Sequence, residues 1–231
     1  MTAADEIWAV VPVKELAGAK QRLAGSVPPA LRPGFVLAML EDVLDALEGA
    51  SGLAGIAVVT VDPVAGRLAR SRGARIIVDR ARDGHRGAVG GAAARLRSEG
   101  IGGMLTVPGD IPAVTPAEIE EVLRAHLPAP AVTIVPAHDR RGSNALLVSP
   151  PDLIPFEFGD DSFLPHVAGA RRAGAEAVQL TLAGIGLDID SPADLARFLA
   201  LQLPRRATAF LAAAALEPPD PEDRQRVRPA R

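Results

Sequence analysis

Short, mostly apolar runs recur along the chain and are separated by polar or glycine-rich segments. The first run, at residues 7–13, reads IWAVVPV and contains no polar side chain. A continuous apolar run is typical of a strand that is covered on both faces inside a parallel sheet. The pattern predicts strands at residues 7–13, 56–61, 75–78, 103–107, 131–135 and 145–149.

Segments with helical spacing lie between these runs. Apolar residues at positions 36, 37, 40, 43, 44 and 47 predict a helix that begins after Pro33 and Gly34. The sequences TPAE at 115–118 and SPAD at 191–194 each place a hydroxyl at the N-cap, followed by proline and then a carboxylate, which indicates two further helix starts. The alternation predicts an α/β fold: a Rossmann-like domain with a mostly parallel, mixed sheet, helices on both faces and an antiparallel strand late in the chain.

The size and composition of the chain fit one hydrophobic core. It has 231 residues, of which 48% are hydrophobic, and we expect the domain to span residues 1–203. Residues 204–231 are expected to form a short alanine-rich helix and then a solvated tail, because residues 217–231 hold four prolines and eight charges. The chain begins with polar and acidic residues and has no apolar run of the roughly 18 residues that cross a bilayer, so we expect a cytoplasmic protein with no membrane partner.

The charge balance excludes several classes of function. With 25 basic and 28 acidic residues, the formal net charge of −3 argues against a broad nucleic-acid-binding surface. The chain has no cysteine, which excludes disulfides, thiolate metal sites and cysteine nucleophiles. The histidines His85, His126, His138 and His166 lack close metal-binding spacing, so we expect them at the surface or behind other functional groups. The sequence leaves open whether the chain forms a homodimer.

Three cations follow the first predicted strand, at the end where sheets of this class bind ligands. They are Lys14, Lys20 and Arg22, and the two lysines are the only ones among the 25 Lys and Arg residues. A lysine ammonium is compact and can follow a phosphate as it moves, which the rigid arginine fork does less well. We therefore expect a phosphate-binding loop here; the alternative is a solvated charged loop.

Two acidic segments also follow predicted strands or precede helices. Asp110 lies in the turn PGDIP at 108–112, and Asp188 and Asp190 flank Ile189 in an extended segment, so that both carboxylates project to one face. Hard oxygen ligands favour magnesium, and we predict that Asp110, Asp188 and Asp190 hold it for phosphoryl chemistry. The alternatives are an ordinary aspartate turn at Asp110 and stabilisation of the following helix end by Asp190.

The usual nucleotide-binding motifs are missing. Neither G-x-G-x-x-G after a strand nor G-x-x-x-x-G-K-[ST] occurs, which argues against dinucleotide dehydrogenases and P-loop enzymes. Residues 79–94 are rich in glycine and alanine and lead into a predicted helix. Small residues allow a flat base to approach the backbone, although the overall bias toward glycine and alanine explains the segment equally well.

The segments with the two lysines, with Asp110 and with Asp188 and Asp190 resemble motifs of a known family. It is the guanylyltransferase family that activates a small phosphorylated three-carbon acid in biosynthesis of the deazaflavin coenzyme F-420. The three motifs occur in the same order along the chain as in that family. The resemblance covers residues 7 to about 199. The sequence VPVKELAGAKQRL at 11–23 resembles the family opening P-V-K-x-L-x-x-A-K-x-R-L, which replaces the glycine-rich loop of related nucleotidyltransferases. PGDIP at 108–112 is similar to the family's metal turn A-D-L-P, and DIDSPADL at 188–195 resembles its ending D-I-D-T-P-x-D-L.

Two further segments resemble the part of the family that binds the acceptor. RGSNAL at 141–146 is similar to G-T-N-A-L, and FGDDSF at 158–163 resembles the F-G-x-x-S-F segment that holds the acceptor's phosphate and carboxylate. The match makes Asn144, Gly159 and Ser162 acceptor-binding candidates. Ser162 is also placed to cap a helix over about 164–172, whose free N–H groups attract anions.

The resemblance implies a GT-A-like nucleotidyltransferase that transfers GMP from GTP to 2-phospho-L-lactate, phosphoenolpyruvate or 3-phosphoglycerate and releases pyrophosphate. The choice among these acids stays open. By the same match, Lys14, Lys20, Arg22 and Asp110 are catalytic candidates. The residues implied to contact the nucleotide are Pro12, Val13, Lys14, Asp79, Gly84, Ala88 and Asp110.

One departure from the family pattern concerns the base. The sequence DGHRGA at 83–88 stands where the family has a G-L-N-A-A-like stretch, so Arg86 takes the place of the asparagine expected near the base. Transfer of a cytidylyl or uridylyl group therefore stays open. Two other classes also remain: a D-x-D metal-dependent glycosyltransferase, which would release a nucleoside diphosphate from a sugar nucleotide, and a non-catalytic nucleotide-binding regulatory module, which would bind GTP without turnover.

Overall fold

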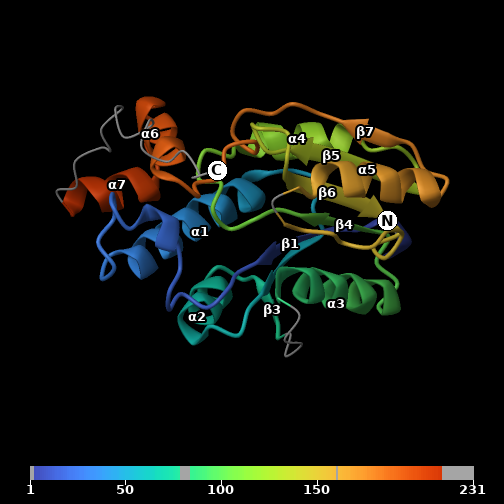
Figure 1. Cartoon of the computed structure of the whole chain (residues 1–231). Coiled ribbons are helices and arrows are strands. Elements are labelled where there is room, and N and C mark those ends of the chain that lie inside the picture. Colours follow the sequence, from blue (N-terminus) through green and yellow to red (C-terminus); the bar gives the residue numbers. More distant parts are fainter. Residues whose placement is uncertain (1–2, 79–83, 160, 215–231) are drawn as a thin grey trace.

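A seven-stranded sheet forms the centre of the computed structural model, which describes residues 3–78, 84–159 and 161–214 (Figure 1). The strands run across the sheet in the order β3-β2-β1-β4-β6-β5-β7. In chain order they are β1 (Ile7–Pro12), β2 (Gly55–Val59), β3 (Arg75–Ile77), β4 (Gly103–Thr106), β5 (Ala131–Pro136), β6 (Ser143–Ser149) and β7 (Ala177–Gln179).

The sheet is mixed but mostly parallel. β1 pairs in parallel with β2 and β4, β2 with β3, and β5 with β7, whereas β6 is antiparallel to both β4 and β5. The predicted α/β class and mixed sheet are thus confirmed, and the late antiparallel strand is β6. The prediction of strands was wrong in one place, because it omitted β7 at the sheet edge.

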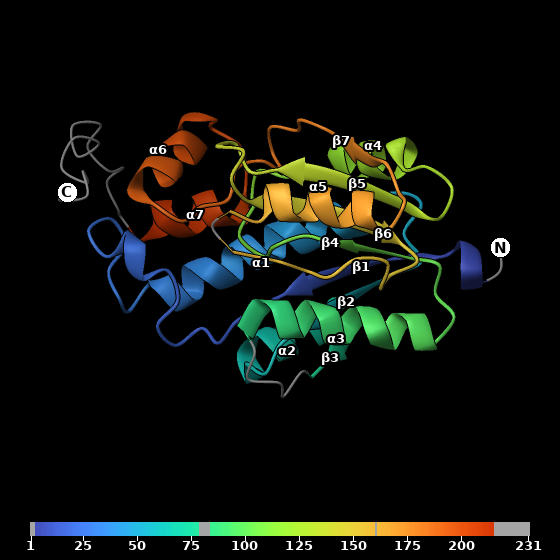
Figure 2. The same cartoon turned by 45° about the vertical axis from the view of Figure 1, so that its right-hand side comes forward.

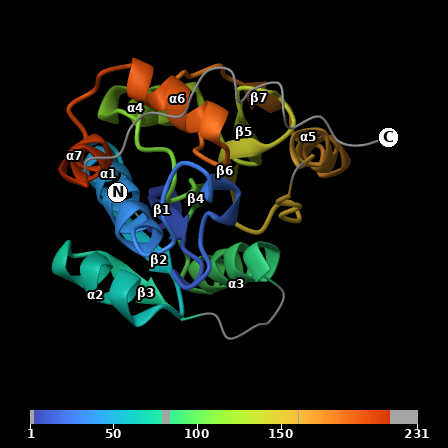
Figure 3. The same cartoon turned by 60° about the vertical axis from the view of Figure 1, so that its left-hand side comes forward.

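Helices cover both faces of the sheet, as Figure 3 shows. One apolar cluster joins the sheet to α1 (Arg32–Gly49), α2 (Pro63–Ser71) and α4 (Pro116–Ala125), and the other joins it to α3 (Gly84–Ser98) and α5 (Phe163–Arg172). Adjacent residues of β1 point to opposite faces of the sheet. Val11 packs in the first cluster and Val10 in the second, and both are fully buried. This explains why the strand has no polar position, since both of its faces are covered.

A third apolar cluster lies at one end of α1. It joins α1 to α6 (Pro192–Ala200) and α7 (Arg206–Ala213), which lie beside each other in Figure 2. The buried carboxylate of Asp42 on α1 accepts hydrogen bonds from the backbone N–H groups of Arg206 (2.8 Å) and Ala207 (2.9 Å), which secures the start of α7. The helix expected within residues 204–231 thus packs on α1, while the expected tail at 217–231 lies outside the described residues and stays a prediction, as does the boundary at residue 203.

Both predicted helix starts form complete capping boxes. The hydroxyl of Thr115 accepts from the N–H of Glu118, whose carboxylate accepts from the N–H of Thr115, and Ser191 and Asp194 repeat this arrangement at α6. Each capping box lies just after one of the acidic segments, the first after Asp110 and the second after Asp190. The boxes therefore fix where the helices begin relative to these segments. None of the helices in the described parts of the chain is long and apolar enough to cross a membrane.

Candidate active site at the carboxyl ends of the strands

The loop that carries the two lysines is fixed at several points. The N–H of Val13, just after β1, donates to the carbonyl of Val59 at the end of β2 (2.9 Å). The buried Leu16 donates its N–H to Oδ2 of Asp62 (3.0 Å), whose Oδ1 caps α2. Lys20 has a φ of 52°, in the left-handed region that side chains rarely adopt, so the surrounding contacts must hold it there.

The ammonium of Lys20 lies between two carboxylates from distant parts of the chain. Its Nζ is 2.5 Å from Oδ2 of Asp110 and 2.6 Å from Oδ1 of Asp190, and its side chain is 10% exposed. Burial opposes the charged form of Lys20, but the charges and hydrogen bonds of Asp110 and Asp190 outweigh this effect and raise the pKa of the ammonium above its ordinary value. Burial raises the pKa of Asp190, but the charge and hydrogen bond of Lys20, together with the charges of Arg22 and Lys14, outweigh this effect and lower that pKa. Lys20 is therefore a permanent cation at this point.

The turn after β4 is joined to the D-x-D segment by the backbone. The carbonyl of Asp110 accepts from the N–H of Ile189 (3.1 Å), and Ile189 is fully buried in the third apolar cluster, as the alternation predicts. Oδ1 of Asp110 is buried and has no hydrogen-bond partner among the described residues. A buried carboxylate oxygen without a partner is costly, so this atom is suited to a ligand or cation.

Asp188 is half-buried and is held by a neighbouring amide. Its Oδ1 accepts from Nδ2 of Asn144 (3.0 Å), which also donates to the carbonyl of Ile185 (3.0 Å). Burial raises the pKa of Asp188, the hydrogen bond from Asn144 lowers it, and the charges of Asp110 and Asp190 raise it, with a net increase. The three carboxylates thus repel one another. Lys20 contacts two of them, Asp110 and Asp190, and the charges of Arg22 and Lys14 also act on Asp190.

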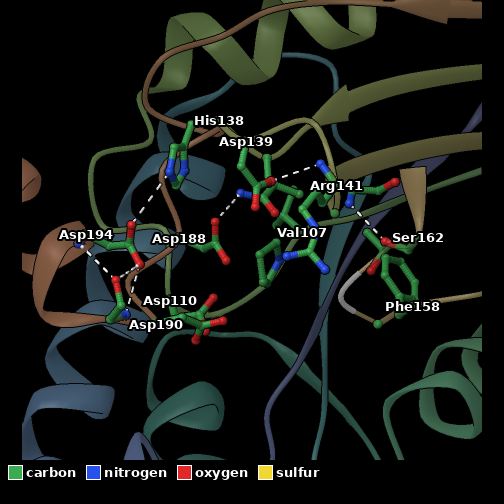
Figure 4. Close-up of a pocket in the computed structure, with 18 of the residues that line it drawn as sticks. Val107, Asp110, His138, Asp139, Arg141, Phe158, Ser162, Asp188, Asp190 and Asp194 are labelled. Atoms are coloured by element: carbon green, nitrogen blue, oxygen red, sulfur yellow. Dashed lines mark hydrogen bonds and ion pairs between the residues drawn. The ribbon is translucent and has the colours of Figure 1, made fainter. Parts of the chain in front are cut away.

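The three carboxylates line a cavity of about 680 Å³. Figure 4 shows this cavity with the side chains around it. Its acidic end holds Asp110, Asp188 and Asp190, while Arg141, Ser162 and Phe158 lie at the other end. The predicted site residues that line this cavity are Lys14, Arg22, Asp110, Asn144, Gly159, Ser162, Asp188 and Asp190. The two distant acidic segments and the acceptor-binding candidates therefore share one cavity.

The remaining predicted residues are placed elsewhere. Lys20 is not among the residues that line the cavity, and its ammonium lies against two of the lining carboxylates. Pro12 and Val13 are buried where β1 ends, and Ala88 packs on the sheet from α3, so none of these three contributes to the wall. Gly84 begins α3, and Asp79 lies outside the described residues, as does the side chain of Arg86.

The carboxylates do not form a closed metal cage. Among the described residues, no group of three or more His, Cys, Asp or Glu side chains is arranged to hold a metal ion. Magnesium, however, is commonly bound through one or two carboxylates together with substrate phosphates. The oxygen chemistry of Asp110, Asp188 and Asp190, and the unpartnered Oδ1 of Asp110, fit a cation held in that way.

One expectation about Ser162 was wrong. Ser162 stands at the N-cap position of α5, but its side chain makes no capping hydrogen bond. Its Oγ instead accepts from the backbone N–H of Ser143 at the start of β6 (3.0 Å). The tertiary contact between β6 and α5 has replaced the local cap, which the sequence alone does not reveal.

Among the residues in the cavity wall that sequence reasoning did not single out are His138, Asp139, Arg141, Phe158 and Asp194. Nε2 of His138 is 3.7 Å from Oδ1 of Asp194, and the N–H of Arg141 donates to Asp139 (2.9 Å). Arg141 and Phe158 lie inside the two quoted acceptor-binding segments, so that signal was present. Asp194 was interpreted only as a helix cap, and His138 carried no motif.

Comparison with solved structures defines the fold. A Desulfovibrio desulfuricans protein proposed to be a nucleotide-diphospho-sugar transferase is similar with a TM-score of 0.73 and 19% identity, covering 91% of this chain and 96% of its own. A nucleotidyl transferase from Methanothermobacter has a TM-score of 0.58 at 19% identity, covering 90% of this chain and 99% of its own. The fold is therefore that of the nucleotidyltransferases.

Sequence comparison then gives the family. Residues 7–221 match the family described as guanylyl transferase CofC like, and the chain belongs to this family. The phosphoenolpyruvate guanylyltransferase of Rubrobacter xylanophilus is 40% identical over 83% of this chain and 92% of its own. That of Streptomyces avermitilis is 39% identical over 92% of this chain and 96% of its own. The predicted resemblance is thereby confirmed, and the chain is a guanylyltransferase.

Proposed function

We propose that this chain transfers the GMP group of GTP to the phosphate of phosphoenolpyruvate and releases pyrophosphate, as a step in biosynthesis of the deazaflavin coenzyme F-420. The observation that carries this proposal is the single cavity bounded by Asp110, Asp188 and Asp190 at one end and by Gly159 and Ser162 at the other. A nucleoside triphosphate and a small anionic acceptor must bind side by side in order to react, and the two ends of this cavity allow that. The names of the relatives favour phosphoenolpyruvate among the three acids that the sequence left open.

The reaction joins two phosphates. An oxygen of the acceptor phosphate attacks the α-phosphorus of GTP, a new P–O bond forms, and the bond from the α-phosphorus to the oxygen of the leaving pyrophosphate breaks. The nucleophile is already an anion at neutral pH, so no side chain has to remove a proton. The protein contributes alignment of the two phosphates and compensation of their charge.

The cations of the loop after β1 supply part of that compensation. Lys14 and Arg22 are exposed side chains in the wall of the cavity, where a triphosphate would meet them. Lys20 acts from behind the wall: its charge, fixed between Asp110 and Asp190, offsets the negative potential that would otherwise repel the nucleotide. Asn144, Gly159 and Ser162 bind the acceptor in this proposal.

A divalent cation fits the acidic end, and we favour magnesium. A Mycobacterium tuberculosis protein of the same fold, 19% identical with a TM-score of 0.54 over 84% of this chain and 98% of its own, was solved in complex with manganese. Here one or two of the carboxylates of Asp110, Asp188 and Asp190 would hold the ion together with phosphate oxygens. When bound, the ion supplies positive charge to the phosphates during transfer.

Recognition of the base is proposed to involve the segment from Asp79 to Ala88 together with Pro12 and Val13, as the family resemblance implies. Arg86 departs from the family pattern in this segment, so the assay compares GTP with ATP, CTP and UTP. The reaction is expected in the cytoplasm, where both proposed substrates are metabolites.

The test is a matrix of pyrophosphate-release assays with magnesium, in which GTP, ATP, CTP and UTP are each combined with 2-phospho-L-lactate, phosphoenolpyruvate and 3-phosphoglycerate. We expect release with GTP and phosphoenolpyruvate above all other pairs. Release with CTP or UTP instead would overturn the base, and release with another acid would overturn the acceptor. GTP binding without turnover on any acid would favour the regulatory module, and nucleoside diphosphate from a sugar nucleotide would favour a glycosyltransferase.

A further inference from the structure

A buried histidine lies directly behind two serines of the cavity. His166 on α5 is 0% exposed, and its Nε2 accepts a hydrogen bond from the backbone N–H of Glu157 (2.9 Å). Its Nδ1 is 2.9 Å from Oγ of Ser143. Because Nε2 is an acceptor, the neutral ring carries its hydrogen on Nδ1, and this N–H donates to the Ser143 hydroxyl oxygen.

A hydrogen bond also connects Ser143 to the second serine, Ser162. The N–H of Ser143 donates to Oγ of Ser162 (3.0 Å), and both serines line the cavity. Each hydroxyl oxygen thus already accepts a hydrogen bond from the protein behind it. In the described part of the chain no acceptor is found for either hydroxyl hydrogen, so both are available to donate into the cavity, which suits an anion.

The histidine ring is held in its plane by its neighbours. The ring of Phe158 meets it edge to face with centroids 5.0 Å apart, and Phe156 stacks on Phe158 with centroids 6.1 Å apart. These contacts keep the ring from turning, so the Nδ1 donor stays directed at Ser143. The arrangement links the segment 156–158, β6 and α5 around one end of the cavity.

We propose that His166 is a positioning residue for the acceptor: by donating to Ser143 Oγ, it keeps the hydroxyls of Ser143 and Ser162 oriented as donors to a small anion that carries a phosphate and a carboxylate. This inference rests on the proposed function, in which that anion is phosphoenolpyruvate. His166 does not touch the acceptor itself. Its effect passes through Ser143.

Two substitutions separate this role from a structural one. In His166→Asn the side-chain amide nitrogen stands near the former Nδ1 and keeps the donor to Ser143, but the acceptor for Glu157 is lost. In His166→Gln the amide reaches the former Nε2 position and accepts from Glu157, but the donor to Ser143 is lost. We expect the KM for phosphoenolpyruvate to rise about tenfold in His166→Gln and to change far less in His166→Asn, with the KM for GTP unchanged in both.

Ser143→Ala completes the test, because it leaves His166 in place and removes only a hydroxyl. It is expected to raise the KM for phosphoenolpyruvate, and His166→Gln added to it is expected to have no further effect. Thermal unfolding of every variant and calorimetric titration with phosphoenolpyruvate accompany the kinetics. Equal effects of Asn and Gln, an unchanged KM in Ser143→Ala, or additive effects in the double variant would overturn the inference alone. If the wild-type chain neither binds nor turns over phosphoenolpyruvate, the proposed function falls and the inference falls with it.

Discussion

Lys20 supplies a buried positive charge to the acidic end of the site. Its ammonium contacts carboxylates that lie 90 and 170 positions away along the chain. A buried cation with two carboxylate partners is stable, whereas removal of one partner leaves charge uncompensated. The sequence singles out Lys20 because lysine is rare in this chain, but it cannot show that the partners are Asp110 and Asp190, since that contact exists only after folding.

The first prediction concerns Asp110. Asp110→Asn keeps the shape of the turn but removes one negative charge from the acidic end and one charged partner from Lys20. We expect pyrophosphate release to fall by about 100- to 1000-fold while the chain still folds, because preorganised charge is lost from the reacting centre. Steady-state kinetics and thermal unfolding measure both effects.

The matched control is Asp152→Asn, the same substitution at an exposed carboxylate paired with Arg97 outside the cavity. It is expected to retain wild-type turnover. An Asp110→Asn variant that is as active as this control would remove Asp110 from the proposed site.

At the scale of the elements, Asp62 connects α2 to the lysine loop. One of its oxygens accepts from the N–H groups of Val64 (2.8 Å) and Ala65 (3.0 Å), and the other accepts from Leu16 (3.0 Å). Burial raises the pKa of Asp62, but these hydrogen bonds outweigh it and lower the pKa below its ordinary value. The carboxylate therefore stays ionised at neutral pH and accepts hydrogen bonds from both α2 and the lysine loop.

Asp62→Ser separates the two contacts, because a serine hydroxyl can cap α2 but has no second oxygen for Leu16. We expect the KM for GTP to rise about three- to tenfold while the thermal midpoint stays close to that of the wild type. Asp62→Ala loses both contacts and is expected to lower the midpoint as well. A GTP KM in Asp62→Ser equal to that of the wild type would show that the loop does not depend on this hydrogen bond.

A second element-scale prediction concerns His126, which follows α4. Its Nδ1 is 2.9 Å from Thr133 Oγ1 in β5, and its Nε2 is 3.0 Å from Ser149 Oγ in β6. Burial lowers the pKa of His126 to about 4, against 6.5 in an unfolded chain. The unfolded state therefore binds the proton first as the pH falls, and this contribution to stability is complete above pH 6.5 and is lost between pH 6.5 and about 4.

Urea unfolding at several pH values measures this effect. The free energy of unfolding of the wild type should fall more steeply across that window than that of His126→Gln, by at most about 1.4 kcal/mol per pH unit. Other groups that titrate in acid affect both proteins equally, so the difference between the two slopes isolates His126. Parallel slopes would contradict the assignment.

The elements show where sequence reasoning succeeds. The buried strands were predictable because a strand covered on both faces consists mostly of apolar residues. The helix starts at Thr115 and Ser191 were predictable because capping is local. β7 was not, since Ala177–Gln179 is short and only partly buried at the edge of the sheet. The place of β6 between β4 and β5 depends on pairing between distant segments, which no local pattern encodes.

The candidate site divides in the same way. The alternation around Ile189 correctly predicted a buried isoleucine, with the two aspartates both lining the cavity. The contacts of Ser162 with Ser143, and of His166 with both Ser143 and Glu157, were beyond prediction because each joins segments that meet only in the folded chain. Motif resemblance pointed to segments that line the cavity, but not to the groups behind them.

For the molecule as a whole, the topology brings the site together. β1 and β4 are adjacent, so the loop after β1 and the turn at Asp110 meet at one edge of the sheet, and the segment before α6 returns to the same place. The C-terminal part supports this edge: the guanidinium of Arg205 donates to the carbonyl of Val114 (2.9 Å), shortly after Asp110. The central claim is that one nucleotide and one acceptor react in the cavity that results.

The most direct measurement is a crystal structure of the full chain with manganese, phosphoenolpyruvate and a GTP analogue in which a methylene group replaces the oxygen between the α- and β-phosphorus atoms. The account predicts the analogue's α-phosphate beside Asp110 and the phosphoenolpyruvate beside Ser143 and Ser162, with the acceptor phosphate facing the α-phosphorus. A nucleotide bound in a different crevice, with Asp110, Asp188 and Asp190 contacting neither phosphate nor metal, would contradict it.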